Sequence, residues 1–305
     1  MSWPSPASRE LASQELPSIA ELPLTAELPV TATTSNVFDK ITIEKLSHRW
    51  LSRTQPPTIA LTDVSFEFPA GKVTAIVGPS GCGKSTLLLI LRGLLQPSEG
   101  KIKFFYGNPG AKEPWQRQAG PPPRMATVWQ SFNLLPWRNV IDNVSFGLEL
   151  ASVDKAERHA KAQEAIRAVD LAGFENHYPA QLSGGMRQRV GLARGLVMAP
   201  EILFLDEPFG ALDAQTRLYL QEQLASVVEK TGKTAILVTH SIEEAIYLGD
   251  RVLVMTARPG KVAASLDIDL PRPRDFEMQK SPRFGELFAE IYGLLRDEVR
   301  KSMLS

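Results

Sequence analysis

The chain has 305 residues, of which 43% are hydrophobic and 22% are charged, a balance typical of a globular protein with a substantial core. Its 34 Lys and Arg residues are matched by 34 Asp and Glu residues, so the basic excess of most nucleic-acid-binding proteins is absent and we expect no nucleic-acid partner. The single cysteine excludes an intrachain disulfide framework. No apolar run reaches the ~18 residues of a membrane span, and the N-terminus has no apolar signal-peptide core.

The first segment, residues 1–38, is rich in Pro, Ser, Thr and Glu and repeats the triplet Glu-Leu-Pro from Glu15, Glu21 and Glu27. Proline at this density opposes both helices and central strands. The composition therefore predicts a disordered tail over residues 1–38. A solvated tail is a simpler interpretation of the triplets than a partner-binding role.

The segment after this tail shows the periodicity of strands, and the residues behind it show that of a helix. Strands are expected at Ile41–Leu46, Val64–Phe68, Val73–Val77, Lys101–Tyr106 and Met125–Gln130. A helix is expected over Thr86–Leu95. The Pro- and Gly-rich stretch up to Pro123 predicts an exposed loop.

The second half of the chain alternates helices with short, wholly apolar strands. Residues 131–199 are mostly helical in pattern, and Asp154 with Glu157 resembles a capping box at a helix start. Ile202–Leu205 and Ala235–Val238 are apolar throughout, as buried strands are. Buried strands separated by helices predict an α/β fold with a parallel sheet covered on both faces.

The C-terminal residues predict an amphipathic helix. Ser281 and Pro282 are start signals, and one helical face carries Phe284, Leu287, Phe288, Ile291, Leu294 and Leu295. We place a main domain at residues 39–260 and a C-terminal extension with this helix at residues 261–305.

The strongest local motif is Gly-Pro-Ser-Gly-Cys-Gly-Lys-Ser at residues 78–85, which fits G-x-x-x-x-G-K-[ST] at every position. Its glycines let backbone N–H groups approach phosphate oxygens, and the following helix points its positive end at the same anion. Lys84 would lie between the β- and γ-phosphates, and the Ser85 hydroxyl would bind Mg²⁺. The motif therefore predicts ATP and Mg²⁺ as ligands, with Cys82 a bystander. The predicted phosphate-binding residues are Gly78, Pro79, Ser80, Gly81, Cys82, Gly83, Lys84, Ser85 and Thr86.

A pair of carboxylates follows the apolar strand Ile202–Leu205. Ligands bind at the carboxyl ends of strands in open α/β sheets, and Asp206 and Glu207 emerge there. Asp206 would orient Mg²⁺, and Glu207 would act in catalysis by polarising the attacking water.

A further glycine-rich helix start lies at Leu182–Arg189, where Ser183, Gly184 and Gly185 precede a basic helical run. This is another anion-receptive arrangement. One ATP needs only one cradle, so a second cradle suggests a site that another copy of the chain completes in trans.

From about Ile41 to the C-terminus, these motifs resemble the ATP-binding subunit of ABC transporters. The resemblance implies a RecA-like P-loop NTPase core, a small antiparallel β subdomain and an inserted helical subdomain at about residues 131–199. It implies an ATPase in which two subunits sandwich two ATP molecules, with Ser183, Gly184 and Gly185 serving the γ-phosphate of the partner's site. Met186 replaces the glutamine commonest in that motif.

The resemblance also implies roles for single residues. Gln130 would join Ser85 and Asp206 around Mg²⁺ and sense the permease. Asp213 would lie in the loop that crosses the dimer interface. His240, after the strand Ala235–Val238, would be the catalytic switch histidine that contacts the γ-phosphate.

Two further positions have competing interpretations. Trp50 follows a strand where the family stacks an aromatic ring on adenine, although the segment Arg49–Pro57 differs from the usual length and composition. Packing is the other interpretation of Trp50. Ser241 with Glu244 predicts a capping box, so we assign Glu244 no catalytic role.

Four further segments resemble importers of nitrate, taurine, alkanesulfonates, bicarbonate and some pyrimidine precursors. They are Phe132–Trp137, Phe209–Arg217, Thr256–Gly260 and Leu270–Asp275. The resemblance implies a peripheral subunit at the cytoplasmic face of the inner membrane, paired with a second copy or a paralogue. Its other partners would be an integral-membrane permease and, indirectly, a periplasmic or lipid-anchored solute-binding protein. The cargo would be recognised by those other chains.

A soluble ABC ATPase without a permease, acting in DNA repair or on ribosomes, is the competing hypothesis. Such proteins carry two cassettes or a long coiled-coil insertion, and this chain has one cassette and no heptad run. A purely regulatory nucleotide binder is disfavoured because both Glu207 and His240 are present.

Overall fold

The computed structural model describes residues 37–51, 56–107, 118–210 and 212–303. The predicted tail falls on residues 1–36, outside the described residues, and on the first two residues of strand β1 (Val37–Trp50). The tertiary contacts group Asn36–Ser305 into one unit, which holds both sheets and all the helices of the described residues.

The smaller of two sheets is antiparallel and is built from strands that lie between residues 37 and 120. It contains β1, β2 (Thr58–Pro69), β4 (Glu99–Gly107) and the short β5 (Gln118–Gly120), in the order β2-β1-β4-β5. Apolar residues of β1 alternate with polar ones, and Ile41, Ile43 and Leu46 are buried, as expected for a sheet with one covered face.

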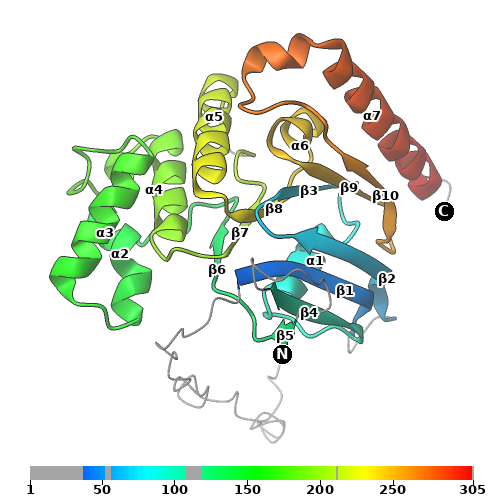
Figure 1. Cartoon of the computed structure of the whole chain (residues 1–305), viewed down its shortest axis with the longest axis horizontal. Helices are drawn as coiled ribbons and strands as arrows, with labels where there is room; N and C mark the ends of the chain where they lie inside the picture. Colours follow the sequence, from blue (N-terminus) through cyan, green and yellow to red (C-terminus); the bar gives the residue numbers. More distant parts are fainter. Residues whose placement is uncertain (1–36, 52–55, 108–117, 211, 304–305) are drawn as a thin grey trace, which may run out of the picture. The chain divides into compact units, whose positions relative to one another are not determined.

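The larger sheet forms the centre of the unit (Figure 1). Its order is β10-β9-β3-β8-β7-β6, parallel from β9 to β6 with β10 antiparallel at one edge. The bounds are β3 Val73–Val77, β6 Met125–Val128, β7 Ile202–Asp206, β8 Thr234–Val238, β9 Arg251–Met255 and β10 Val262–Asp267.

Side chains of this sheet alternate between two hydrophobic clusters. Leu203 and Leu205 of β7 belong to the cluster shared with α2 to α7, and Phe204 belongs to the cluster shared with α1 and the small sheet. Both faces are therefore covered, which is why β3 and β8 are apolar at nearly every position. The predicted RecA-like α/β arrangement is confirmed.

The helices lie between and around these strands. Their bounds are α1 Lys84–Leu91, α2 Val140–Leu150, α3 Lys155–Ala168, α4 Gly184–Leu196, α5 Ala214–Thr231, α6 Ile242–Leu248 and α7 Pro282–Met303, with 3₁₀ turns at Pro179–Gln181 and Phe276–Lys280. Helices α2, α3 and α4 pack on one another as a helical subdomain (Figure 1).

Local sequence signals explain where several helices begin and end. Asp154 accepts hydrogen bonds from the N–H groups of Ala156 and Glu157 and so caps α3. The predicted helix Thr86–Leu95 lies too far toward the C-terminus, since α1 runs from Lys84 to Leu91. The helix ends there because Gly93, two residues later, has a positive φ of 72°.

Helix α7 packs its apolar stripe against the unit. Phe284, Leu287 and Ile291 are buried, and Phe288, Leu294 and Leu295 pack beside them. Among the helices of the described residues, none has the length and apolar character needed to cross a membrane.

Candidate active site

Four neighbouring parallel strands bring the sequence motifs to one edge of the large sheet. The order β3-β8-β7-β6 places four segments side by side at the carboxyl ends of these strands. These are the phosphate loop (Gly78–Thr86) after β3, His240 after β8, Asp206 and Glu207 at the end of β7, and Gln130 after β6. Motifs spread over the sequence thus converge where α/β sheets bind ligands.

The phosphate loop curls between β3 and α1. Gly81 and Gly83 have positive φ angles of 75° and 100°, a conformation that residues with a Cβ seldom adopt. The Lys84 ammonium is buried and donates to the carbonyl oxygens of Gly78 at 2.7 Å and Pro79 at 3.1 Å. The loop therefore surrounds a cationic centre at the N-terminal end of a helix.

Close packing also fixes the identities of these glycines. A Cβ on Gly83 would lie 2.8 Å from the carbonyl oxygen of Ala60, and one on Gly78 would lie 2.8 Å from Cys82 Sγ. Cys82 itself is buried, and this burial raises the pKa of its thiol. A buried, protonated thiol is a poor nucleophile, in line with the bystander interpretation.

Glu207 lies at the centre of a small polar cluster. Its Oε2 accepts a hydrogen bond from Gln130 Nε2 at 3.2 Å and lies 3.4 Å from His240 Nδ1. Its backbone N–H donates to the carbonyl oxygen of Val238 at 2.9 Å. The structure thus joins Gln130, Glu207 and His240, which come from three separate strands.

Asp206 is less exposed than a typical surface carboxylate and lies among charges. Burial, with a smaller contribution from Glu207, raises its pKa, whereas Arg92 and Lys84 lower it. The Arg92 guanidinium stacks over Trp129 at 4.0 Å from the ring centroid. Cations beside the strand end therefore favour the ionised form of Asp206 against the effect of burial.

An open cavity of about 520 Å³ lies over the phosphate loop. Trp50 is 44% exposed at one side of it, with its ring held edge-on by His48 at 4.9 Å between centroids. An exposed indole at the wall of a phosphate-binding cavity is suited to stacking on a base. The residues lining the cavity are Trp50, Thr58, Ala60, Ser80, Gly81, Gly83, Lys84, Ser85, Thr86, Glu207, His240 and Arg258.

The second glycine-rich motif lies elsewhere. Ser183 caps α4, with its Oγ accepting from the Met186 N–H at 3.3 Å, and Gly185 packs so closely on Thr216 that a Cβ would overlap it. Asp213 caps α5 and accepts from the Thr216 N–H at 3.0 Å, which lowers the pKa of Asp213. The residues that line this cavity do not include Ser183, Gly184, Gly185 or Asp213.

Comparison with known proteins decides what these motifs belong to. Residues 61–210 match the family model described as ABC transporter. The chain is also 48% identical over 244 residues to an uncharacterized ABC transporter ATP-binding protein of Methanocaldococcus jannaschii, covering 80% of this chain and 87% of that protein. This chain belongs to the ABC transporter family. It is an ATP-binding ATPase.

Other similar proteins include import subunits. The ABC ATPase is 46% identical to the taurine import ATP-binding protein of Rhizobium johnstonii, over 77% of this chain and 88% of that protein. It is 42% identical to the nitrate import ATP-binding protein of Synechococcus elongatus, over 79% of this chain but only 36% of that longer protein.

Solved structures confirm the fold. The dimeric structure of a bacterial ABC transporter cassette matches with a TM-score of 0.62 and 30% identity, covering 76% of this chain and all of that one. A post-hydrolysis state of the same cassette, bound to ADP and Pi, matches equally well.

The structure of this ABC ATPase corrects the predicted capping box at α6. The Glu244 N–H does donate to Ser241 Oγ at 3.1 Å, but the Glu244 carboxylate does not return to the Ser241 backbone. It is buried and accepts a hydrogen bond from Thr239 Oγ1 at 2.5 Å. The side chain turns inward because the α6 face that carries it packs on the core.

Sequence reasoning also missed Arg258 as part of the cavity wall. It lies in the Thr256–Gly260 segment, which the sequence singles out only for its resemblance to importers. Its Nε donates to the carbonyl oxygen of Gly81 at 3.3 Å. No local signal links these two residues, which are 177 positions apart.

Proposed function

We propose that this chain powers a membrane importer of a small oxyanion such as nitrate, taurine or another sulfonate, or bicarbonate. It would act at the cytoplasmic face of the inner membrane, bound to a separate permease that receives solute from a solute-binding protein. The observation that carries the proposal is the similarity to taurine and nitrate import ATP-binding proteins over more than three quarters of this chain. The competing soluble ATPase finds no support among these relatives.

The phosphate loop and Trp50 would bind ATP. The N–H groups around Gly81 and Gly83, the N-terminus of α1 and the Lys84 ammonium would hold the phosphates, while the Trp50 ring would stack on adenine. Glycine conformation and the buried position of Lys84 support these roles.

The Ser85 hydroxyl, the Gln130 amide oxygen and the Asp206 carboxylate would hold Mg²⁺, which would neutralise phosphate charge when bound. These are the hard oxygen donors that Mg²⁺ prefers. Among the described residues no group of three or more His, Cys, Asp and Glu could hold a metal by itself. Such a sparse protein ligand set fits an ion that takes further ligands from nucleotide phosphates.

Glu207 would orient and deprotonate the attacking water, and His240 would bind the γ-phosphate. The hydrogen bond from Gln130 and the nearby His240 ring limit where the Glu207 carboxylate can point. A fixed acceptor is what general-base catalysis requires. Because Gln130 also leads into the loop that follows β6, it offers a route from the permease to the catalytic carboxylate.

A second copy, or a paralogue, would complete each site. Ser183, Gly184 and Gly185 lie at a helix N-terminus that is suited to an anion but lines no part of this copy's cavity. Asp213 would lie in the interface beside them. The similarity to a cassette solved as a dimer supports this arrangement.

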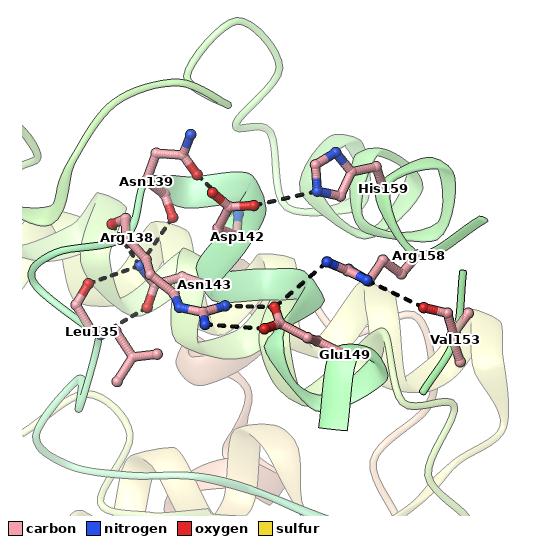
Figure 2. A network of polar contacts seen from close by, with 9 residues as sticks. All are labelled: Leu135, Arg138, Asn139, Asp142, Asn143, Glu149, Val153, Arg158 and His159. Carbon is pink, nitrogen blue, oxygen red and sulfur yellow. Dashed lines mark hydrogen bonds and ion pairs between the residues drawn. The ribbon is translucent and has the colours of Figure 1, made fainter. Parts of the chain in front are cut away.

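The loop before α2 would dock the permease. Trp137 is 70% exposed there, whereas Leu134 packs against the core. Figure 2 shows how the neighbouring residues fix this loop: the buried Asn143 bonds to Leu135 N–H at 2.8 Å and to three carbonyl oxygens, and Arg138 forms two bonds with Glu149. A rigid loop that exposes a large aromatic side chain is suited to anchoring a partner helix.

The same loop is tied to α4. Arg194 donates to the carbonyl oxygens of Phe132 and Asn133 at 3.0 and 2.6 Å. Since α4 begins at the Ser183 motif, movement of a docked permease would reach the residues that serve the partner's ATP.

The test is to delete this chain from its host and follow growth on nitrate, taurine, another sulfonate or bicarbonate as the limiting nutrient. Loss of uptake of one of these solutes, restored by the wild-type chain and not by Glu207→Gln, is expected. Normal uptake of all four solutes with loss of uptake of a sugar, metal or peptide would refute the cargo class.

Co-purification tests the docking loop. It should recover a membrane permease from wild type and from Tyr292→Ala, an exposed aromatic on α7, and much less from Trp137→Ala.

A further inference from the structure

The loop at residues 256–261, between β9 and β10, packs against the phosphate loop. Gly260 lies against the Cys82 carbonyl so closely that a Cβ there would overlap it. The Gly260 N–H donates to the Ala60 carbonyl oxygen at 2.9 Å, and the Gly260 carbonyl accepts from the Thr62 N–H at 3.0 Å. The loop is therefore bonded to β2 and packed on the nucleotide cradle.

Further bonds hold the loop in one conformation. The Thr256 hydroxyl donates to the Pro259 carbonyl oxygen at 3.0 Å and accepts from the Lys261 N–H at 2.9 Å. The Ala257 N–H donates to Glu298 Oε2 of α7 at 3.2 Å. The side chain between these anchored positions, Arg258, is thus presented from a fixed backbone.

Arg258 extends from this loop to the rim of the cavity. Its side chain is exposed, lines the cavity and donates through Nε to the Gly81 carbonyl oxygen. Of the lining residues, Lys84 is the other lysine or arginine, and its ammonium is bonded to loop carbonyls.

We propose that Arg258 is a nucleotide-binding residue whose guanidinium contacts the phosphate chain of ATP at the outer rim of the phosphate loop. The guanidinium presents several N–H donors in a planar fork that matches phosphate oxygens. With Nε directed at Gly81, the terminal nitrogens remain for the ligand.

This role rests on the nucleotide site of the proposed function and adds a residue to it. It also gives the Arg-Pro-Gly segment a purpose: Gly260 allows the close approach to Cys82, and Arg258 supplies the charge. A merely structural role, in which Arg258 only braces the Gly81 carbonyl, makes different predictions for salt and for phosphate number.

The experiment measures ATP and AMP affinity of the full chain in a Glu207→Gln background, which prevents turnover. Arg258→Met should weaken ATP binding about five- to ten-fold at low salt and weaken AMP binding less, whereas Arg258→Lys, which keeps the charge but lacks the planar fork, should give an intermediate loss. The loss should shrink at high salt, because an exposed charge is screened. Lys261→Met, an exposed cation three positions away, should bind ATP like the background.

An unchanged ATP affinity in Arg258→Met would overturn the proposal, as would an equal loss for ATP and AMP or a loss that salt does not reduce. A lower melting temperature with unchanged affinity would establish the bracing role instead. If the background chain fails to bind ATP, and Lys84→Ala behaves the same, the nucleotide site itself is refuted together with the role of Arg258. If only the proposal for Arg258 is wrong, the background chain still binds ATP and the Lys84→Ala variant does not.

Discussion

Glu207 has a positive φ of 45°, a backbone conformation that costs a residue with a Cβ about 1 kcal/mol or more. The turn follows directly from β7, and the Glu207 N–H donates to Val238 of the neighbouring strand β8. The conformation turns the carboxylate toward Gln130 and His240. Such strain persists only where surrounding structure imposes it, as it does at many functional sites.

Replacing Glu207 by Gln should abolish steady-state hydrolysis and leave ATP binding intact. The amide keeps the shape of the side chain but is a poor proton acceptor, and loss of a general base typically lowers the rate ~10²–10⁴-fold. Phosphate release measured beside ATP binding checks this expectation. Turnover near the wild-type rate would show that Glu207 is not the general base.

Glu244 is a buried carboxyl group that interacts electrostatically with Glu207. The pKa of Glu244 is raised to about 7, mainly by burial and to a smaller extent by the charge of Glu207, although the hydrogen bond from Thr239 and the charge of Arg217 lower it. A carboxyl group with a higher pKa in the folded state binds its proton more tightly there. The free energy of unfolding should therefore fall as the pH rises from the ordinary value of 4.5 to about 7.

Glu244→Gln should remove this pH dependence. The variant should unfold at about the same free energy as wild type near pH 5 and be more stable near pH 8, by about 3 kcal/mol at most. Its amide oxygen still accepts the hydrogen bond from Thr239. Chemical unfolding at both pH values tests this, with Glu243→Gln at the adjacent exposed position as the control. A stability difference that is the same at both pH values would contradict the expectation.

At the scale of elements, α6 is fastened at both ends. Its N-terminus follows His240 and is capped by Ser241. At its C-terminus the buried Arg274 donates to the carbonyl oxygens of Ile246, Tyr247 and Gly249. These carbonyls are among those left without partners at a helix end, so Arg274 completes the C-terminal end of the helix that follows His240.

Arg274→Met should destabilise the folded protein by about 3 kcal/mol or more. The substitution leaves buried carbonyl groups without donors, each of which costs about 1–3 kcal/mol. Burial lowers the pKa of Arg274 to about 10, so the side chain is still charged at neutral pH. Urea unfolding measures the loss, and Arg167→Met on the exposed face of α3 is the control. Equal stability of the two variants would show that the α6 carbonyls find other partners.

At the scale of the whole molecule, the arrangement of the site in two copies is the main prediction. Lys84→Ala and Ser183→Ala homodimers should each trap nucleotide poorly. In a mixed dimer, however, one site receives both lesions and the other receives neither. The intact site should again trap one MgATP per dimer in purified mixed dimers. Trapping that stays at the level of the two parents would place both residues in one site of one chain.

The sequence by itself determined the local features of this protein. The phosphate loop is a contiguous motif, the strands β3, β7 and β8 are apolar runs, and the caps at Asp154 and Ser183 lie beside the helices they start. Each of these signals depends on neighbours in the chain, so it can be read without knowing the fold. The motifs together also indicate the family, because each is contiguous and they occur in a fixed order.

The tertiary structure decided which distant residues meet. The strand order β3-β8-β7-β6 joins Gln130, Glu207 and His240 in one cluster, and no local pattern specifies that order. Packing turned the Glu244 carboxylate away from its own helix start toward Thr239. It also placed Arg258 beside Gly81, across 177 residues of sequence. These contacts depend on sheet pairing and burial, which the whole chain determines jointly, and sequence periodicity records only which face of an element is apolar.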